Sequence, residues 1–326
     1  MTGSGNGSQR EQQPRITPQL LYAVGALYYL EEQTQAQIAT RLGTSRPTVS
    51  RLLAEARRQG VVRIELVAPG SEDDASLAEQ VRVALGLQKV HLAPFAPRAV
   101  VGASLASALT RALRSMDLQS DDVLLVGSGR AVYEVAQSDL PELPGVTIVP
   151  TVGGQDDPEP WYQTNEVTRQ IAAKVGGRPV FLYAPALPGP DLHEKLMDDP
   201  SFTRVQELWG RARCAVVGVG APPAARRSLP SFVPKDAPWI KEAVGDVCTR
   251  FFGADGQPLV FEGSDRVVST SLEVLRAVPT VIAVASGHEK VASILAAAGA
   301  GWFTELVTDS LTASELLDAA NGRLAS

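Results

Sequence analysis

The sequence is poor in the residues that carry most catalytic and metal chemistry. It holds two cysteines and three histidines among 326 residues. Cys214 and Cys248 stand far apart and outside any C-x-x-C spacing, so neither a disulfide framework nor a zinc site is predicted. No apolar run reaches the roughly 18 residues that a membrane helix needs, and no signal-peptide pattern opens the chain. These absences predict a cytoplasmic protein without a metal, cofactor or membrane partner.

The chain as a whole also lacks the positive charge that suits a nucleic-acid-binding protein. Its formal net charge is −6, but residues 1–68 carry +3 and the remainder carries −9. Between Arg41 and Arg63, six arginines stand against one glutamate. The positive charge is therefore concentrated in one short segment, as binding to a DNA phosphate backbone requires.

Length and composition predict two domains, because 326 residues exceed what one hydrophobic core usually serves. Residues 1–16 are rich in Gly, Ser and Gln and are expected to form a disordered tail. Residues 17–67 are predicted to form the first domain. A linker rich in Pro, Gly and acidic residues follows at 68–76, and residues 77–326 form the second domain.

The first domain shows three short amphipathic helices in succession. Thr17 before Pro18 begins the first, and T-Q-A-Q from Thr34 has the form of a capping box for the second. Thr44 or Ser45 caps the third, whose apolar positions are Val49, Leu52, Leu53 and Ala56. Gly43 and Gly60 end the second and third helices, and VVRIELV follows as an alternating strand. This order is typical of a winged helix-turn-helix.

The third helix is predicted to read DNA, since its outward positions combine hydroxyl and guanidinium groups. The alternative is a small three-helix packing unit with a solvated basic face. The agreement of charge, caps, turn glycine and strand favours binding to double-stranded operator DNA. The candidate contact residues are Thr34, Gln35, Ser45, Arg46, Pro47, Thr48, Ser50, Arg51 and Arg57.

The second domain alternates apolar runs with helical stretches. The expected buried strands are 123–126, 146–149, 180–182, 215–219, 259–261 and 281–285. The expected helices are 101–114, 131–138, 164–175, 201–211, 290–298 and 313–320. The fold class is therefore α/β, with a doubly wound, largely parallel sheet. Such sheets bind ligands at the carboxyl ends of their strands.

Three glycine-containing loops follow predicted strands and can meet at that edge. In the first, Gly127-Ser128-Gly129-Arg130 runs directly into a helix, which suits a phosphate group because backbone N–H groups and a guanidinium point at it. Turn geometry alone also requires glycine there, so the two interpretations stay open. The others are Thr151-Val152-Gly153-Gly154 and Ser286-Gly287-His288-Glu289-Lys290.

Three polar residues are further candidates for ligand contacts. Asp246 could accept hydrogen bonds from sugar hydroxyls, or it could be a turn aspartate. Lys290 opens a predicted helix, where the helix dipole disfavours a cation, so an anionic ligand or Asp246 would explain it better than solvation does. Asn165 could contact a ligand or cap its helix.

These stretches together resemble the SorC (SorC/DeoR-like) family of bacterial regulators, from about Thr17 to the C-terminus. The resemblance is carried by QTQAQIATRLGTSRPTVSRLLAEARRQGVVRIEL, GSGRAVYEVA, TVGG, LYAPA, AVGDVCTRFF, SGHEKVASILAAA and LVTDSLTASELL. It implies a sugar-binding domain with the fold of ribose-5-phosphate isomerase and glucosamine-6-phosphate deaminase. It also implies a homo-oligomer, a dimer or more commonly a tetramer, on a palindromic operator.

The resemblance also implies an effector pocket for a sugar or sugar phosphate. Its residues would be Gly127, Ser128, Gly129, Arg130, Thr151, Val152, Gly153, Gly154, Asn165, Asp246 and Lys290. Members of the family often have Thr or Ser after Gly-x-Gly-Arg, whereas this chain has Ala131. The effector is then held differently or carries no phosphate.

Two other functions compete with this interpretation. The implied fold also hosts sugar-phosphate isomerases and deaminases, and Asp246 with Lys290 could perform acid–base chemistry. The sequence offers no nucleophile–base pair for such an enzyme. A DNA-binding protein without an effector would leave the three glycine loops unexplained. The sequence therefore predicts a sugar-responsive transcriptional regulator and no enzyme.

Overall fold

The computed structural model describes residues 16–62, 72–94, 101–226, 228–233 and 237–324. The chain divides into two compact units, Met1–Pro69 and Gly70–Ser326. Part of the range predicted as a linker is helical, because α4 (Glu72–Leu85) begins inside it. Acidic residues suit a helix N-terminus as well as a linker, since the helix dipole favours negative charge there. No helix among the described residues is long and apolar enough to span a membrane.

The described part of the first unit, residues 16–62, forms three helices with the predicted caps. They are α1 (Pro18–Tyr29), α2 (Gln35–Arg41) and α3 (Arg46–Arg58). The Thr17 hydroxyl accepts a hydrogen bond from the Leu20 N–H at 3.2 Å. Thr34 and Gln37 complete the capping box at the start of α2. Gly43 and Gly60 have φ of 61° and 71°, which L side chains rarely adopt, so each can end a helix.

The core of the first unit is a single apolar cluster contributed by all three helices. Its members are Leu21, Val24, Leu27, Ile38, Ala39, Val49, Leu52, Leu53 and Ala56. Gly25 allows a close approach in this core, because a Cβ atom there would lie 2.8 Å from Val62. Most of the predicted wing strand, at 63–67, lies outside the described residues.

The second unit contains a seven-stranded parallel sheet in the order β1-β9-β8-β5-β2-β3-β4. Its strands are β1 (Lys89–Ala93), β2 (Val123–Val126), β3 (Thr147–Pro150), β4 (Arg178–Pro179), β5 (Ala212–Gly218), β8 (Thr280–Val284) and β9 (Glu305–Asp309). The hairpin of β6 (Gly245–Val247) and β7 (Arg250–Phe252) stands apart from this sheet. The doubly wound α/β class is confirmed.

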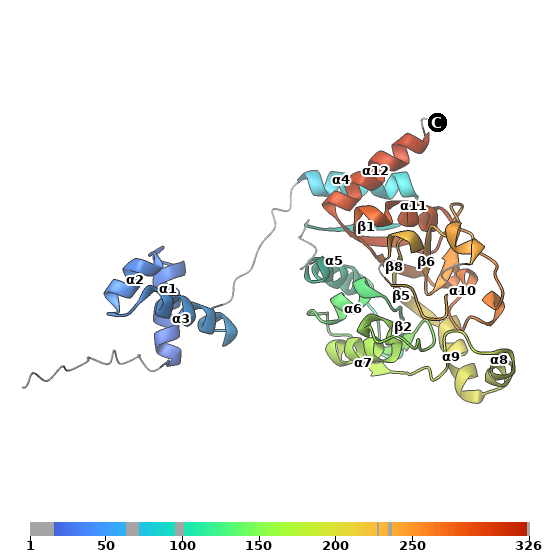
Figure 1. The fold of residues 1–326 in the computed structure, drawn as a ribbon, viewed down its shortest axis with the longest axis horizontal. Helices are drawn as coiled ribbons and strands as arrows, with labels where there is room; N and C mark the ends of the chain where they lie inside the picture. Colours follow the sequence, from blue (N-terminus) through green and yellow to red (C-terminus); the bar gives the residue numbers. More distant parts are fainter. Residues whose placement is uncertain (1–15, 63–71, 95–100, 227, 234–236, 325–326) are drawn as a thin grey trace, which may run out of the picture. The chain divides into compact units, whose positions relative to one another are not determined.

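Helices cover both faces of the sheet (Figure 1). One face packs against α5 (Val101–Ser115), α6 (Arg130–Ala136) and α7 (Thr164–Val175). The other packs against α4, α9 (Pro200–Gly210), α10 (Leu272–Ala277), α11 (Val291–Gly299) and α12 (Ser310–Leu324), with α8 (Pro190–Met197) beside α9. Short 3₁₀ helices lie at Pro160–Tyr162, Pro223–Ala225, Pro238–Lys241, Ser264–Arg266 and His288–Lys290.

Two predicted strands are wrong. Residues 259–261 lie in a loop, where Val260 is 90% exposed, and residues 180–182 follow the two-residue strand β4 without belonging to it. A short apolar run satisfies the pattern of a buried strand whether or not neighbouring strands are available to pair with it. The sequence also missed β1 and β9, which pair with each other at one side of the sheet.

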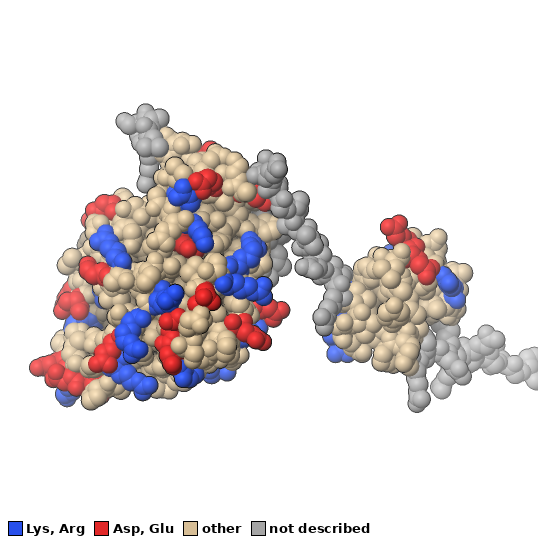
Figure 2. All heavy atoms as spheres, turned by 180° about the vertical axis from the view of Figure 1, so that it is seen from behind, with Lys and Arg blue, Asp and Glu red and all other residues tan. Residues whose placement is uncertain are grey.

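Charge is mixed over the larger unit. Figure 2 shows Lys and Arg side chains interspersed with Asp and Glu across the face of this unit that it presents. Such a surface suits a body that does not attract DNA by its own field. The excess of positive charge that DNA binding needs therefore lies on the first unit.

Candidate functional site

The outward face of α3 combines a capped N-terminus with exposed arginines. Ser45 is the N-cap, and its Oγ lies 2.9 Å from the Thr48 hydroxyl. Val49, Leu52, Leu53 and Ala56 point into the core, which leaves the predicted contact residues Arg46, Pro47, Ser50, Arg51 and Arg57 exposed. Thr34 is exposed at the start of α2, whereas Gln35 is partly buried.

Arginines of this unit differ in their partners. Arg58 forms an ion pair with Glu55, and Arg41 forms one with Glu31 at 3.2 Å. In the described part of the chain, Arg46, Arg51 and Arg57 make no ion pair. Unpaired, exposed guanidinium groups on one helix face suit phosphate oxygens and guanine edges.

In the second unit, the centre of the candidate effector site is a cluster of charges at the carboxyl edge of the sheet. Asp246, on β6, accepts from Arg226 Nη2 through Oδ1 and from the Thr249 N–H through Oδ2, at 3.2 Å for the latter. Both side chains of the Arg226–Asp246 pair are 15% exposed. Gly220 makes room for the pair, since a Cβ atom there would collide with both side chains.

Lys290 lies within reach of these charges but pairs with none of them. Burial, followed by the positive charge of Arg226, lowers the pKa of Lys290 to about 8, against the opposing effects of Glu289, Asp246 and Glu134. Among the described residues, no carboxylate lies within ion-pair distance of its ammonium group. A partly buried lysine in such a setting is an anion-binding candidate.

Arg130 reaches the same cluster through Glu134. Its Nε donates to Glu134 Oε1 at 2.6 Å, and its guanidinium lies 6.0 Å from the centre of the Trp161 ring. Gly129, before α6, has a φ of 105°, a region that L side chains rarely adopt, and its N–H donates to the Trp161 carbonyl at 2.9 Å. Gly129 therefore meets a requirement of turn geometry, Arg130 is the charged residue of the loop, and phosphate binding by the loop stays a prediction.

The Thr151 to Gly154 loop is occupied by contacts within the protein. The N–H groups of Thr151, Gly153 and Gly154 donate to the carbonyls of Val126, Val268 and Ala184 at 2.7–3.0 Å. A Cβ atom at Gly153 would lie 2.6 Å from the Ala184 carbonyl, so this glycine permits close packing. Val152 is buried. The predicted cradle of N–H groups is therefore not available at these three positions.

Asn165 uses one donor and one acceptor site of its amide within the protein. Its Oδ1 accepts from the Leu182 N–H at 3.0 Å, and its Nδ2 donates to the Leu182 carbonyl at 3.1 Å. The amide thus bonds the backbone N–H and carbonyl of Leu182, as a residue of a neighbouring strand would. In this arrangement Asn165 positions the segment after β4, and its second amide N–H and the second lone pair of its Oδ1 stay available to a ligand.

Sequence reasoning missed three residues of the charge cluster. Arg226, Glu134 and Tyr162 all interact with it, and burial raises the pKa of Tyr162. A signal for Arg226 was present, because the Pro-rich segment APPAARRS follows directly after a predicted strand. Glu134 has no such signal, since a glutamate four residues after an arginine in a helix usually forms a surface pair.

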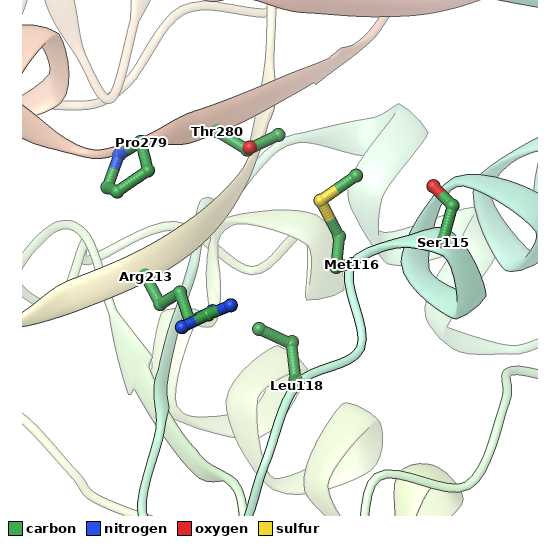
Figure 3. A pocket seen from close by; sticks show the side chains of 6 residues that line it. All are labelled: Ser115, Met116, Leu118, Arg213, Pro279 and Thr280. Carbon is green, nitrogen blue, oxygen red and sulfur yellow. The ribbon is translucent and has the colours of Figure 1, made fainter.

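A separate hollow of about 430 Å³ lies at the opposite, amino edge of the sheet. Figure 3 shows the residues that line it: Ser115, Met116, Leu118, Arg213, Pro279 and Thr280. Arg213 Nε lies 3.7 Å from Asp122 Oδ2, a long ion pair. Doubly wound folds bind ligands at the carboxyl edge, so this hollow is not the meeting point of the effector loops.

Comparisons with known proteins agree with this division of the chain. Residues 71–318 match the family model described as "Putative sugar-binding domain", and residues 16–70 match the MarR family model. The deoxyribonucleoside regulator of Bacillus subtilis is 30% identical over 312 residues, which cover 93% of this chain and 99% of that protein. The sorbitol operon regulator of Klebsiella pneumoniae is 29% identical over 317 residues, covering 91% and 97%.

The crystal structure of the full-length Klebsiella regulator superposes with a TM-score of 0.72 at 28% identity, covering 92% of this chain and 98% of that chain. A helix-turn-helix unit followed by a sugar-binding domain defines a sugar-responsive transcriptional regulator. The chain belongs to the SorC/DeoR-type family of these regulators. The predicted family is confirmed.

Proposed function

We propose that this regulator binds a sugar phosphate, or a similar anionic polyol, at the Arg226–Asp246–Lys290 cluster, and that this binding changes its affinity for operator DNA. The observation that carries this proposal is Lys290. Its ammonium group has a lowered pKa, no ion-pair partner in the described structure and a second cation, Arg226, nearby. An anion that meets both cations would remove their mutual repulsion and supply the missing partner.

The rest of the cluster suits the polyol part of such a ligand. Asp246 has acceptor capacity beyond its two present hydrogen bonds, and sugar hydroxyls are donors. Two relatives are named for molecules with two or more hydroxyl groups, one as a sorbitol operon regulator and one as a deoxyribonucleoside regulator. In this proposal the Arg226 guanidinium leaves Asp246 and binds the anionic group of the ligand. A ligand hydroxyl group then donates to the Asp246 carboxylate in its place.

Operator contact is assigned to α3 and the start of α2. The candidate residues are those of the sequence prediction, and the three unpaired arginines support their role. One α3 helix reads too few bases for a specific site, so we assign the active form to a homo-oligomer on a two-fold symmetric operator.

The side chains of the second unit support binding over catalysis. Burial raises the pKa of both thiols, that of Cys214 to about 12, which removes them as nucleophiles. His91 is engaged with Glu305 at 2.7 Å, on β1 and β9. Assays of purified protein with ribose 5-phosphate and glucosamine 6-phosphate are expected to show no turnover, and measurable turnover would contradict the proposal.

A thermal-shift screen against sugars and their phosphates tests the effector site. We expect at least one phosphorylated compound to stabilise the parent protein. Lys290→Ala should weaken its binding about ten- to hundredfold, the equivalent of one charged hydrogen bond. Lys195→Ala, at an exposed position on α8, is the matched control and should bind like the parent. Equal binding by both variants would contradict the assignment of the site.

A further inference from the structure

The β6–β7 hairpin has a turn in which two consecutive non-glycine residues have positive φ, which occurs nowhere else in the described chain. Val247 pairs with Arg250, so only Cys248 and Thr249 connect the strands. Both residues have left-handed backbones, with φ of 51° and 60°. A two-residue turn with two positive φ values normally uses Asn-Gly, and a β-branched residue such as Thr249 is strained there. The hairpin therefore holds an unfavourable backbone conformation.

Polar groups around this turn are also unfavourably placed. Cys248 and Thr249 are buried, and the Cys248 thiol lies next to the hydroxyls of Thr151 and Thr270. The hydroxyls of Thr249 and Ser269 are buried without a hydrogen-bond partner in the described structure, whereas those of Thr151 and Thr270 interact with the Cys248 thiol. Buried hydroxyls are paired in most native structures, because an unpaired group loses its hydration without compensation. Strain and unpaired hydroxyls at one place indicate an element with a second, accessible arrangement.

The turn is tied to the proposed effector site on one side. Asp246, two residues before it, accepts a hydrogen bond from the Thr249 N–H at 3.2 Å. The same carboxylate holds Arg226 and faces the charge cluster. A ligand that changes the hydrogen bonds of Asp246 therefore changes a direct restraint on the turn.

On the other side, Arg250 connects the turn to a neighbouring segment. Its guanidinium donates to the carbonyls of Val267, Ser269 and Thr270 at 3.0–3.1 Å. Thr270 in turn donates through its N–H to the Thr151 carbonyl at 2.8 Å. Residues 267–270 lead into Ser271, which caps α10. A shift of the hairpin would therefore move the start of α10.

We propose that the Cys248–Thr249 turn is a conformational switch of this regulator. Binding of an effector at Asp246 shifts the turn from the strained arrangement to a relaxed one in which its hydroxyls are paired, and Arg250 transmits the change to residues 267–271. The inference rests on the proposed function and adds how occupancy of that site is passed on.

The double variant Cys248→Asn/Thr249→Gly tests the switch, because Asn-Gly adopts the present turn with little strain. It is expected to melt at a higher temperature than the parent. Ribose 5-phosphate or glucosamine 6-phosphate, whichever binds the parent, should still bind, but its effect on operator affinity should fall at least about fivefold. Asp117→Gly is the control, because Asp117 is also left-handed, with φ of 46°, but is exposed and near the amino edge of the sheet.

Hydrogen exchange on the full-length parent protein gives a second measurement that needs no variant. Either sugar phosphate, once bound, should change exchange at residues 245–253 and 267–271. Unchanged exchange there in a parent that binds, or a double variant with the parent's full operator response, would overturn the switch alone. A parent that binds neither compound nor any other member of the panel would contradict the proposed effector site, and the switch with it.

Discussion

At the residue scale, the surroundings of Lys290 lower the pKa of a cation that we propose binds an anion. The fold places it beside Arg226 and partly out of water, and both effects favour its neutral form. The nearby carboxylates of Asp246 and Glu134 act in the opposite direction without contacting it. Among the described residues no carboxylate pairs with this ammonium, so the affinity of a ligand phosphate that does should depend on whether the proton is present.

Affinity for a sugar phosphate is expected to fall as the pH rises through about 8, where Lys290 loses its proton. The phosphate group has its second pKa near about 6, so its own charge stays constant in this range. Titration calorimetry with ribose 5-phosphate or another binding sugar phosphate, from about pH 7 to about pH 9.5, measures the effect. Lys290→Ala should bind weakly at every pH, and a parent whose affinity does not change across this range would refute the role of Lys290.

The Arg226–Asp246 pair leads to a prediction about stability. Arg226→Met leaves the Asp246 carboxylate without its main partner in a largely buried position. The free energy of unfolding should fall by about 3–5 kcal/mol, as for other broken buried pairs. Arg226→Met/Asp246→Asn should lose less than the two single variants together, because the double variant buries no lone charge. Urea unfolding measures all three, and strictly additive losses would show that the two side chains do not interact.

At the element scale, α3 carries one arginine that is held in an ion pair and others that remain unpaired in the described structure. Arg58 is held by Glu55 one turn away, whereas Arg46 and Arg51 are exposed and unpaired in the described structure. An exposed pair of this kind contributes little to stability. The free arginines are therefore better placed to meet DNA than the paired one.

Arg51→Ala or Arg46→Ala is expected to weaken operator affinity by about 1–3 kcal/mol if the guanidinium reads a base. A phosphate contact would instead weaken binding to all sequences and reduce its salt dependence. Arg58→Ala is the matched control and should change affinity much less. Fluorescence anisotropy at constant salt makes the comparison, and parental affinity in both Arg46→Ala and Arg51→Ala would rule out this face as the reader.

At the scale of the whole molecule, the two units carry opposite charge balances. The basic first unit can approach DNA, while the acidic remainder opposes unspecific binding. The second unit also contains the whole proposed effector site and its switch. Our proposal therefore places effector binding in the second unit, and we expect self-association there as well.

A fragment of residues 72–326 is expected to be at least dimeric at micromolar concentration, because a two-fold operator requires a two-fold protein. It should bind the same sugar phosphates as the full chain and no operator. Light scattering and thermal shift measure these properties. A monomeric fragment would contradict this prediction and would indicate that self-association requires the first unit.

Much of this protein follows from local sequence. Thr34 with Gln37 and Ser45 with Thr48 form caps that depend only on neighbours in the chain, so the helices of the first unit were predicted nearly to the residue. Helix α7 begins and ends as predicted, because Gly176 stops it in a left-handed conformation, with φ of 68°. The family was also predicted from motifs in linear order.

Only the tertiary structure decided which of the candidate residues share a site. It joined Asp246 to Arg226 from a Pro-rich loop and gave the amide of Asn165 to Leu182. It also made Gly153 of the Thr151 to Gly154 loop a close packing contact, and it placed 259–261 in a loop whose one bond to a strand is from the Leu259 N–H to Phe251 on β7 among the described residues. Caps and helical stripes depend on residues three or four positions apart, whereas a charge cluster depends on where distant strands end, and no local pattern records that.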